Sequence, residues 1–125
     1  MKTPHILIVD DEPNIVMSLE FLMRKNGYQV GIARNGIEAL AAIDQTPYDL
    51  ILLDVMMPDV DGLQVCRQLR ARPDRAGAKV IFLSAKSREA DVRQGYDAGA
   101  DLYLSKPFST RQLMEKVREL LGIAA

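Results

Sequence analysis

The chain has few of the residues that build several common kinds of site. It contains one cysteine and one histidine among 125 residues. A lone cysteine excludes an intramolecular disulfide and a cysteine metal cluster, and it is consistent with a reducing compartment. No apolar run approaches the roughly 20 residues needed to span a bilayer, and the N-terminus lacks the layout of a signal peptide. We therefore expect a cytoplasmic location and no membrane partner.

Neither sign of charge dominates the sequence. Sixteen basic residues are balanced by seventeen acidic ones, so the net charge is -1 and no basic tract stands out. This balance argues against direct binding of nucleic acid. The composition, 48% hydrophobic and 26% charged, is ordinary for a globular protein. We expect one domain, residues 1–125, which is long enough to bury a core.

Short aliphatic runs alternate with amphipathic stretches along the chain. The pattern predicts strands at about 5–9, 28–33, 49–53, 79–83 and 101–104. It predicts helices at about 13–26, 36–44, 63–70, 87–99 and 109–121. Alternating strands and helices form a parallel sheet with helices on both faces. We therefore expect an α/β, flavodoxin-like doubly wound (βα)5 fold with five parallel strands in the order 2-1-3-4-5.

Local signals mark the ends of several predicted helices. Gly27 suits the position just after the first helix. Asp61 and Ser87 are candidate N-caps of the third and fourth helices, and Ser109 begins a capping-box pattern for the fifth. On the second helix, we expect Ile37 to face inward with the other aliphatic residues.

Polar residues follow four of the five predicted strands at the point where each strand ends. They are Asp10 and Asp11, Asp54, Ser84, and Lys106. In the expected order these four strands are neighbours, and the strand without a polar residue lies at the edge of the sheet. Such folds bind ligands outside the carboxyl ends of their strands. We therefore expect three carboxylates, one hydroxyl and one ammonium to converge on one pocket.

This set of groups suits a divalent cation and a phosphoryl group. Three carboxylates in one pocket repel one another unless a cation or a proton neutralises them. Because the ligands are all oxygen, the site favours Mg²⁺, or Mn²⁺, over zinc. A carboxylate can attack phosphorus to form an aspartyl phosphate, and the surrounding groups then supply positioning and charge neutralisation.

Five blocks of sequence carry a family resemblance. They are 9–13 (VDDEP), 53–62 (LDVMMPDVDG), 83–85 (LSA), 99–101 (GAD) and 106–108 (KPF). With these blocks in this order and spacing, the chain resembles the receiver domain of two-component response regulators, in the CheY-like superfamily. The resemblance spans nearly the whole chain. It implies a phosphoacceptor switch rather than a turnover enzyme.

The resemblance implies roles for the acidic residues. Asp54 would accept a phosphoryl group from a phosphohistidine on a sensor histidine kinase or a histidine phosphotransfer protein. Asp11 would ligate Mg²⁺ directly, and Asp10 would do so directly or through water. Asp54 and the backbone carbonyl of Met56 would complete the protein's share of the coordination.

The resemblance also implies roles for the other pocket residues. Lys106 would contact the phosphoryl oxygens, and its bond to Pro107 is often cis in such domains. Ser84 would hydrogen-bond the phosphoryl group and draw its loop inward. Threonine is common at that position, so this chain keeps the hydroxyl and lacks the methyl group. Tyr103 would take part in the switch by moving between exposed and buried rotamers.

The resemblance further implies a readout surface at about 87–121, formed by the fourth helix, the fifth strand and the fifth helix. This surface would control a downstream partner, a homodimer or an effector domain of a longer protein. Its charged residues are Asp97, Asp101, Arg111, Glu115, Lys116, Arg118 and Glu119. Winged-helix transcription factors of the family tend to have an acidic residue where this chain has Leu102, which argues against their mode of dimerisation.

Other interpretations fit part of the pattern. A Mg²⁺-dependent phosphatase or phosphotransferase could use Asp54 as its nucleophile. Such enzymes usually carry nucleophile and acid on one strand, however, whereas the carboxylates here are divided between two strands and no cap domain is present. A flavodoxin-like nucleotide binder would need a Gly-rich loop after the first strand. Asp11 could also be a simple N-cap, Ser84 a loop hydroxyl and Tyr103 a packing residue.

Met56 and Lys86 each lie two residues past a pocket residue, where side chains can flank a phosphoryl group. We interpret them as residues that tune the lifetime of an aspartyl phosphate by controlling the access of water.

Overall fold

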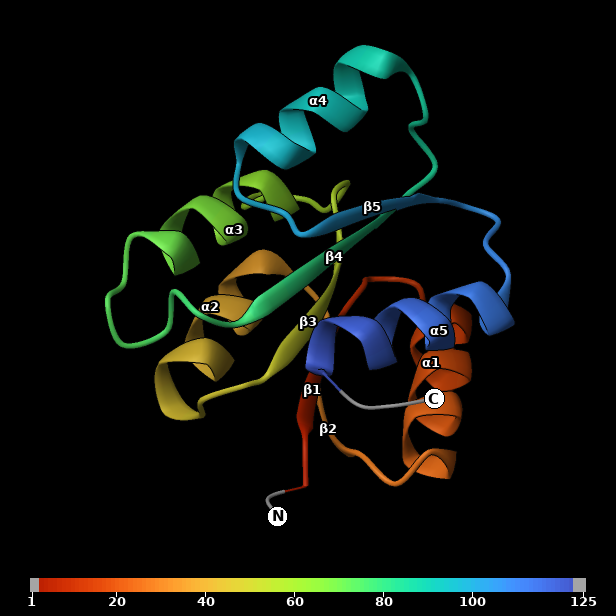
Figure 1. Ribbon diagram of the computed structural model, residues 1–125. Coiled ribbons are helices and arrows are strands. Elements are labelled where there is room, and N and C mark those ends of the chain that lie inside the picture. The colour runs from red at the N-terminus through yellow and green to blue at the C-terminus, as the bar shows by residue number, and fades with distance from the viewer. Residues whose placement is uncertain (1–2, 123–125) are drawn as a thin grey trace.

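The computed structural model describes residues 3–122 and shows a five-stranded sheet between two layers of helices (Figure 1). The strands are β1 His5–Val9, β2 Gln29–Ala33, β3 Leu50–Asp54, β4 Lys79–Ser84 and β5 Leu102–Ser105. The helices are α1 Pro13–Lys25, α2 Gly36–Gln45, α3 Gly62–Arg70, α4 Glu89–Asp97 and α5 Thr110–Leu121. The strands are parallel in the order β2-β1-β3-β4-β5. The expected flavodoxin-like fold is confirmed.

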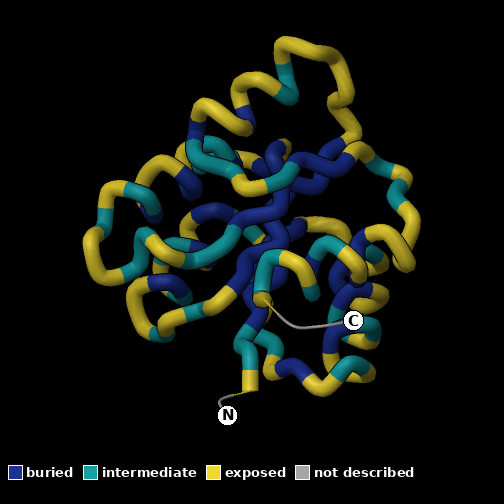
Figure 2. Tube along the Cα trace, viewed as in Figure 1, coloured by how far each residue is buried: buried dark blue, intermediate teal, exposed yellow. Residues whose placement is uncertain are grey.

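Each face of the sheet buries its own set of aliphatic side chains. Along β1, Leu7 and Val9 join the cluster beneath α2 and α3, whereas Ile6 and Ile8 join the cluster beneath α1 and α5. β3 is buried at every position and lies in the dark centre of Figure 2. A strand covered on both faces is an apolar run that does not alternate with polar residues, which is why the central strands were recognisable in the sequence.

Most helix ends follow the local signals in the sequence. The Asp61 side chain accepts a hydrogen bond from the Gln64 N–H at the start of α3. At the start of α5, Ser109 likewise accepts one from the Gln112 N–H. Gly27 follows α1 with a φ of 87°, in the left-handed region that favours glycine. Within residues 3–122, no helix is both long enough and apolar enough to cross a membrane.

Two predictions about helices are wrong. The N-cap of α4 is Arg88 rather than Ser87, because the backbone stays extended for one residue more before the helix begins. Ile37 is 60% exposed and does not face inward. α2 turns Gly36 and Ala39 toward the core instead, because the first turn of the helix packs closely against a neighbouring loop.

The parallel register brings the polar strand ends to one edge of the sheet. Val9 pairs with Leu53, and Asp54 pairs with Leu83 on the next strand. The residues that follow β1, β3, β4 and β5 therefore emerge side by side at the carboxyl edge. β2, which carries no polar anchor, lies at the side of the sheet as expected.

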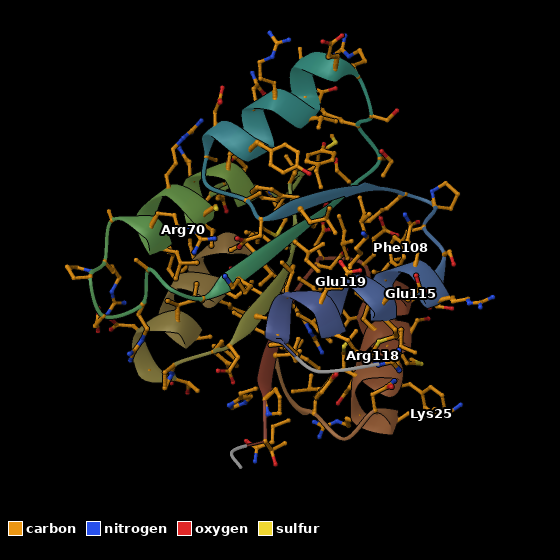
Figure 3. The ribbon with its side chains drawn as sticks, viewed as in Figure 1. Lys25, Arg70, Phe108, Glu115, Arg118 and Glu119 are labelled. Carbon is orange, nitrogen blue, oxygen red and sulfur yellow. The ribbon has the colours of Figure 1, made fainter. Side chains whose placement is uncertain are left out.

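The opposite edge of the sheet is tied together by Arg70, the last residue of α3. Its Nε donates to the carbonyl of Gly99 at 2.9 Å, and its Nη1 donates to the carbonyls of Ala76 and Ala78. Its Nη2 pairs at 2.9 Å with the carboxylate of Asp101, which also accepts a backbone N–H of β4 at 2.8 Å. Arg70 extends from α3 toward β4 (Figure 3). One side chain thus joins α3, the start of β4 and the turn between α4 and β5.

Replacing Arg70 by methionine should lower the free energy of unfolding by about 2 kcal/mol, because several carbonyls and one carboxylate lose a charged donor. Arg67→Met, on the exposed side of the same helix, should change it by less than about 0.5 kcal/mol. Urea denaturation of the wild type and the two variants provides the measurement. Equal losses in the two variants would show that Arg70 does not act as a clamp.

Candidate functional site

Three carboxylates gather at the carboxyl edge of β1 and β3. Oxygen atoms of Asp10, Asp11 and Asp54 all lie within 4.8 Å of one another. Asp10 and Asp54 are buried, with 1% and 5% of their surface exposed, whereas Asp11 is open to solvent. Carboxylate oxygens at this spacing, with solvent on one side, suit a hard cation that binds carboxylates and keeps several waters. The donor set therefore fits the divalent metal that the sequence predicts.

Asp54 is the last residue of β3, and its environment opposes ionisation. Burial is the main cause that raises its pKa to about 6, and the nearby charge of Asp10 adds to the effect. Lys106 and the N–H of Met56 act in the opposite direction, and that N–H donates to Asp54 Oδ1 at 3.2 Å. The carboxylate consequently gains from any cation or covalent change that removes its charge.

Lys106 follows β5 and enters the same pocket. Its Nζ donates to Asp10 Oδ2 at 3.1 Å and lies 3.8 Å from Asp54 Oδ1. Burial lowers the pKa of Lys106, but the hydrogen bond to Asp10 and the negative charges around it outweigh burial, and the net pKa is raised. The bond to Pro107 is cis, in agreement with the resemblance. The ammonium therefore stays charged and lies nearer to Asp10 than to Asp54.

Glu12 is a pocket residue that the sequence pattern did not single out. Its N–H donates to Asp10 Oδ1 at 2.9 Å, and its carboxylate lies 4.0 Å from the Lys106 ammonium. The signal that could have found it is its position directly after the acidic pair and ahead of the first helix. By holding one oxygen of Asp10, the Glu12 backbone leaves the other oxygen for Lys106.

Ser84 ends β4 with its side chain fully buried. The Lys86 N–H donates to Ser84 Oγ at 3.0 Å, and the Tyr103 hydroxyl donates to the Lys86 carbonyl at 2.8 Å. Tyr103 is in a buried position, with 8% of its surface exposed. A short chain of hydrogen bonds thus connects the Tyr103 ring to the Ser84 hydroxyl. Since Oγ acts as the acceptor in that chain, its own proton remains free for another acceptor.

A cavity of ≈ 500 Å³ opens between α4 and the loop that follows β3. Met56 and Lys86 line it together with Tyr103. The Met56 side chain is 52% exposed and Lys86 is also exposed, so both can move. The two residues therefore lie next to the segment that directly follows Asp54, where they can cover one side of the pocket.

Gly62 allows α3 to begin directly against the end of β3. A Cβ at this position would collide with the backbone carbonyl oxygen of Asp54. The Gly62 N–H donates to the Val55 carbonyl at 3.0 Å. Because Gly62 has no side chain, the start of α3 can pack directly against the backbone of Asp54.

Most charged residues of the expected readout surface already have partners within the chain: Arg111 pairs with Glu115 and Lys116 with Glu119 along α5, while Asp101 and Arg118 reach other elements. Asp101 pairs with Arg70. Arg118 donates to Asn26 Oδ1 at 3.0 Å and reaches from α5 toward α1 (Figure 3). A dimer contact through either residue would have to compete with these interactions.

Sequence comparison identifies the family. The response regulator receiver domain matches residues 6–118. The transcriptional regulatory protein ResD of Bacillus subtilis (strain 168) is 45% identical over 120 residues, which cover 96% of this chain and 49% of ResD. The chain spans about half the length of the curated relatives it matches.

Solved structures agree with this assignment. The signal receiver domain of a signal transduction histidine kinase from Syntrophus aciditrophicus has a TM-score of 0.90 and 38% identity, covering 96% of this chain and 91% of that chain. The receiver domain of the sensor histidine kinase PA1611 from Pseudomonas aeruginosa PAO1 has a TM-score of 0.89 and 30% identity. The match covers 97% of this chain and 99% of that chain. That structure has a magnesium ion coordinated in its active site cleft. The chain therefore belongs to the response regulator receiver domains, CheY-like signalling phosphoacceptors rather than turnover enzymes.

Proposed function

We propose that this chain is a signalling switch in which Asp54 accepts a phosphoryl group from a phosphohistidine. The donor is a sensor histidine kinase, the partner that a receiver domain implies, or a histidine phosphotransfer protein. The observation that carries the proposal is a buried Asp54 carboxylate with two further carboxylates and an ammonium beside it. The pocket concentrates the groups that phosphoryl transfer needs for positioning and charge neutralisation.

In the transfer step, an oxygen of the Asp54 carboxylate forms a bond to phosphorus. The P–N bond of the phosphohistidine breaks, and the imidazole nitrogen keeps the electron pair. Asp54 must be ionised to attack, and its pKa of about 6 leaves most of it ionised at neutral pH. Lys106, 3.8 Å from Asp54 Oδ1, neutralises the transferred oxygens, and Ser84 donates its free hydroxyl proton to one of them.

A divalent cation would be held by the carboxylates of Asp10, Asp11 and Asp54, together with the Met56 carbonyl. Mg²⁺ suits this oxygen set, and Mn²⁺ is an acceptable substitute. When bound, the cation neutralises the charge of the carboxylates and of the phosphoryl group. Asp10 is already oriented by a hydrogen bond from the Glu12 N–H, and Asp54 by one from Met56, so both ligands are in place beforehand.

Phosphorylation then shifts an existing equilibrium between two conformations. Ser84 and Tyr103 connect the phosphoryl group to α4, β5 and α5, which form the readout surface. That surface acts on a downstream partner, a second copy of the chain or an effector domain. Residues 1–125 act as one receiver domain in the cytoplasm, where response regulators typically work. ResD, a relative with a transcriptional name, is about twice as long as this chain.

Intact mass after incubation with Mg²⁺ and acetyl phosphate tests the acceptor. The wild type should gain one acid-stable, base-labile phosphoryl group, whereas Asp54→Ala or added EDTA should abolish the gain. Asp59→Asn removes an exposed carboxylate from the same loop and should behave like the wild type.

Two results would contradict the proposed acceptor. One is a folded wild type without an adduct, and the other is an adduct that persists in Asp54→Ala. Sustained release of phosphate from a small phosphomonoester would favour the alternative, a Mg²⁺-dependent phosphatase or phosphotransferase that uses Asp54 as its nucleophile.

The double change Met56→Ala, Lys86→Ala should shorten the lifetime of the aspartyl phosphate roughly threefold to tenfold, a change of about 1 kcal/mol in the barrier. The reason is that water gains access to the acyl phosphate when the two flexible side chains are removed. Decay of the adduct mass after removal of the donor gives the lifetime. Gln94→Ala, which changes the same cavity from α4, serves as the control. An unaltered lifetime in the double variant would mean that these residues do not shield the site.

Asp54 should make the stability of the metal-free protein depend on pH. Its pKa is raised from 3.8 to about 6, so its favourable contribution is complete below the lower value and is lost as pH rises through the upper one. Asp54→Asn removes the charge. In EDTA near pH 7 this variant should therefore exceed the wild type in stability by about 1–3 kcal/mol, with a smaller gap near pH 4.

Urea denaturation in EDTA at the two pH values measures this gap. Added Mg²⁺ should stabilise the wild type more than Asp54→Asn and so narrow the gap near neutral pH. The exposed-site control Asp59→Asn should show neither effect. A gap of the same size at both pH values would contradict the assignment of the raised pKa to Asp54.

A further inference from the structure

α4 contains a glycine within its last turn. Gly95 lies inside the helix Glu89–Asp97 and is buried. Its φ is not in the left-handed region, so the backbone conformation does not require glycine there. Glycine inside a helix is unfavourable relative to alanine because it loses more conformational freedom on folding. The presence of glycine at this position therefore needs a reason in packing.

The packing reason is the ring of Tyr103. A Cβ at position 95 would lie 2.6 Å from Cδ2 of Tyr103 and 3.3 Å from Cδ2 of Phe82. Phe82 also packs against the Tyr103 ring, with 6.1 Å between the ring centroids. The Tyr103 ring therefore occupies the space that a side chain at position 95 would need. Phe82 packs against the ring and restricts how far the ring can move away.

α4 also contacts the backbone of the same tyrosine. The Tyr103 N–H donates to Tyr96 Oη at 3.2 Å. The Tyr103 hydroxyl in turn holds the Lys86 carbonyl, and the Lys86 N–H holds Ser84 Oγ. α4 thus contacts Tyr103 through two successive residues, at one end of the hydrogen-bond chain that leads to the pocket.

We infer that Gly95 is a positioning residue of the switch, whose missing side chain makes room for the inward position of the Tyr103 ring. The inward ring holds the loop after β4, and with it the Ser84 hydroxyl, in the arrangement that receives the phosphoryl group. The inference rests on the proposed phosphorylation of Asp54 and adds the residue that allows the Tyr103 ring to lie inward. A side chain at position 95 turns the ring outward, breaks its hydrogen bond to Lys86 and releases the loop.

A purely structural role for Gly95 gives different expectations. If glycine only allowed α4 to approach the sheet, an added methyl group would have the same effect whichever residue occupied position 103. If the Tyr103 ring is what the methyl group meets, replacing the ring by a smaller side chain removes the conflict. The dependence of one substitution on the other therefore separates the two roles.

The experiment compares Gly95→Ala, Tyr103→Leu and the double variant with the wild type. Gly77→Ala is the matched control, because within the described residues no heavy atom lies within 4 Å of a Cβ placed there. The proteins carry ¹³C-labelled tyrosine, and Tyr103→Phe identifies the Tyr103 ring signal among the four tyrosines. Relaxation by a soluble gadolinium chelate reports how exposed that ring is in the unphosphorylated, metal-free protein.

The Tyr103 signal should be protected in the wild type and in Gly77→Ala, and exposed in Gly95→Ala. The rate of Asp54 phosphorylation by acetyl phosphate should fall about fivefold in Gly95→Ala, the lower end of common coupling effects. In the Tyr103→Leu background, the added Gly95→Ala change should have no further effect on that rate. The double variant should unfold at the same urea concentration as Tyr103→Leu or at a slightly higher one, because alanine is the better helix former once the ring is gone.

Two results would overturn the inference. One is a Tyr103 ring that stays as protected in Gly95→Ala as in the wild type. The other is a loss of phosphorylation rate from Gly95→Ala that is equally large with tyrosine or leucine at position 103. The relaxation measurement needs no phosphorylation, so it tests the position of the Tyr103 ring independently of the proposed function. A wild type that forms no adduct would instead contradict the proposed function.

Discussion

The confinement of three carboxylates to one edge of the sheet is the constraint on which the rest of the structure depends. Asp10 and Asp54 are buried, and the ammonium of Lys106 is shared between them. One positive charge does not balance three negative ones, so the pocket keeps an excess of negative charge that a divalent cation can offset. The sheet must therefore be stable enough elsewhere to hold like charges together, and two fully packed faces supply that stability.

The two helices beside the pocket are held in different ways. α3 is fixed at both ends: Gly62 places its start against the Asp54 backbone, and Arg70 ties its end to the opposite edge of the sheet. α4 packs on the sheet through Val92 and its last turn, at Gly95 and Tyr96, while the segment at 85–90 that leads into it is exposed. If Asp54 is phosphorylated as proposed, the pocket therefore has a firmly held helix, α3, on one side and a more adjustable helix, α4, on the other.

The sequence predicted the strands and the polar strand ends because both follow from local composition. A strand covered on both faces must be apolar, and a polar residue just past it, as at Asp54, must lie at the carboxyl edge. The errors and omissions arise from tertiary contacts. Ile37 faces solvent because smaller residues of α2 fit the core, and Glu12 matters because a lysine from a distant strand reaches it. Nothing in the local sequence around Gly95 indicates the ring that fills the space beside it.

The contacts of Tyr103 and Lys106 bear directly on the proposed switch. Tyr103 lies inward and holds the loop that carries Ser84, so the structure contains the buried rotamer of the proposed switch. Lys106 donates to Asp10, and under the proposed phosphorylation of Asp54 it would turn toward the phosphoryl oxygens. A modification shifts an equilibrium only by the difference in its interactions with the two states. In the proposed switch one ion pair would replace another, and coupling between sites in proteins is typically about 1–3 kcal/mol.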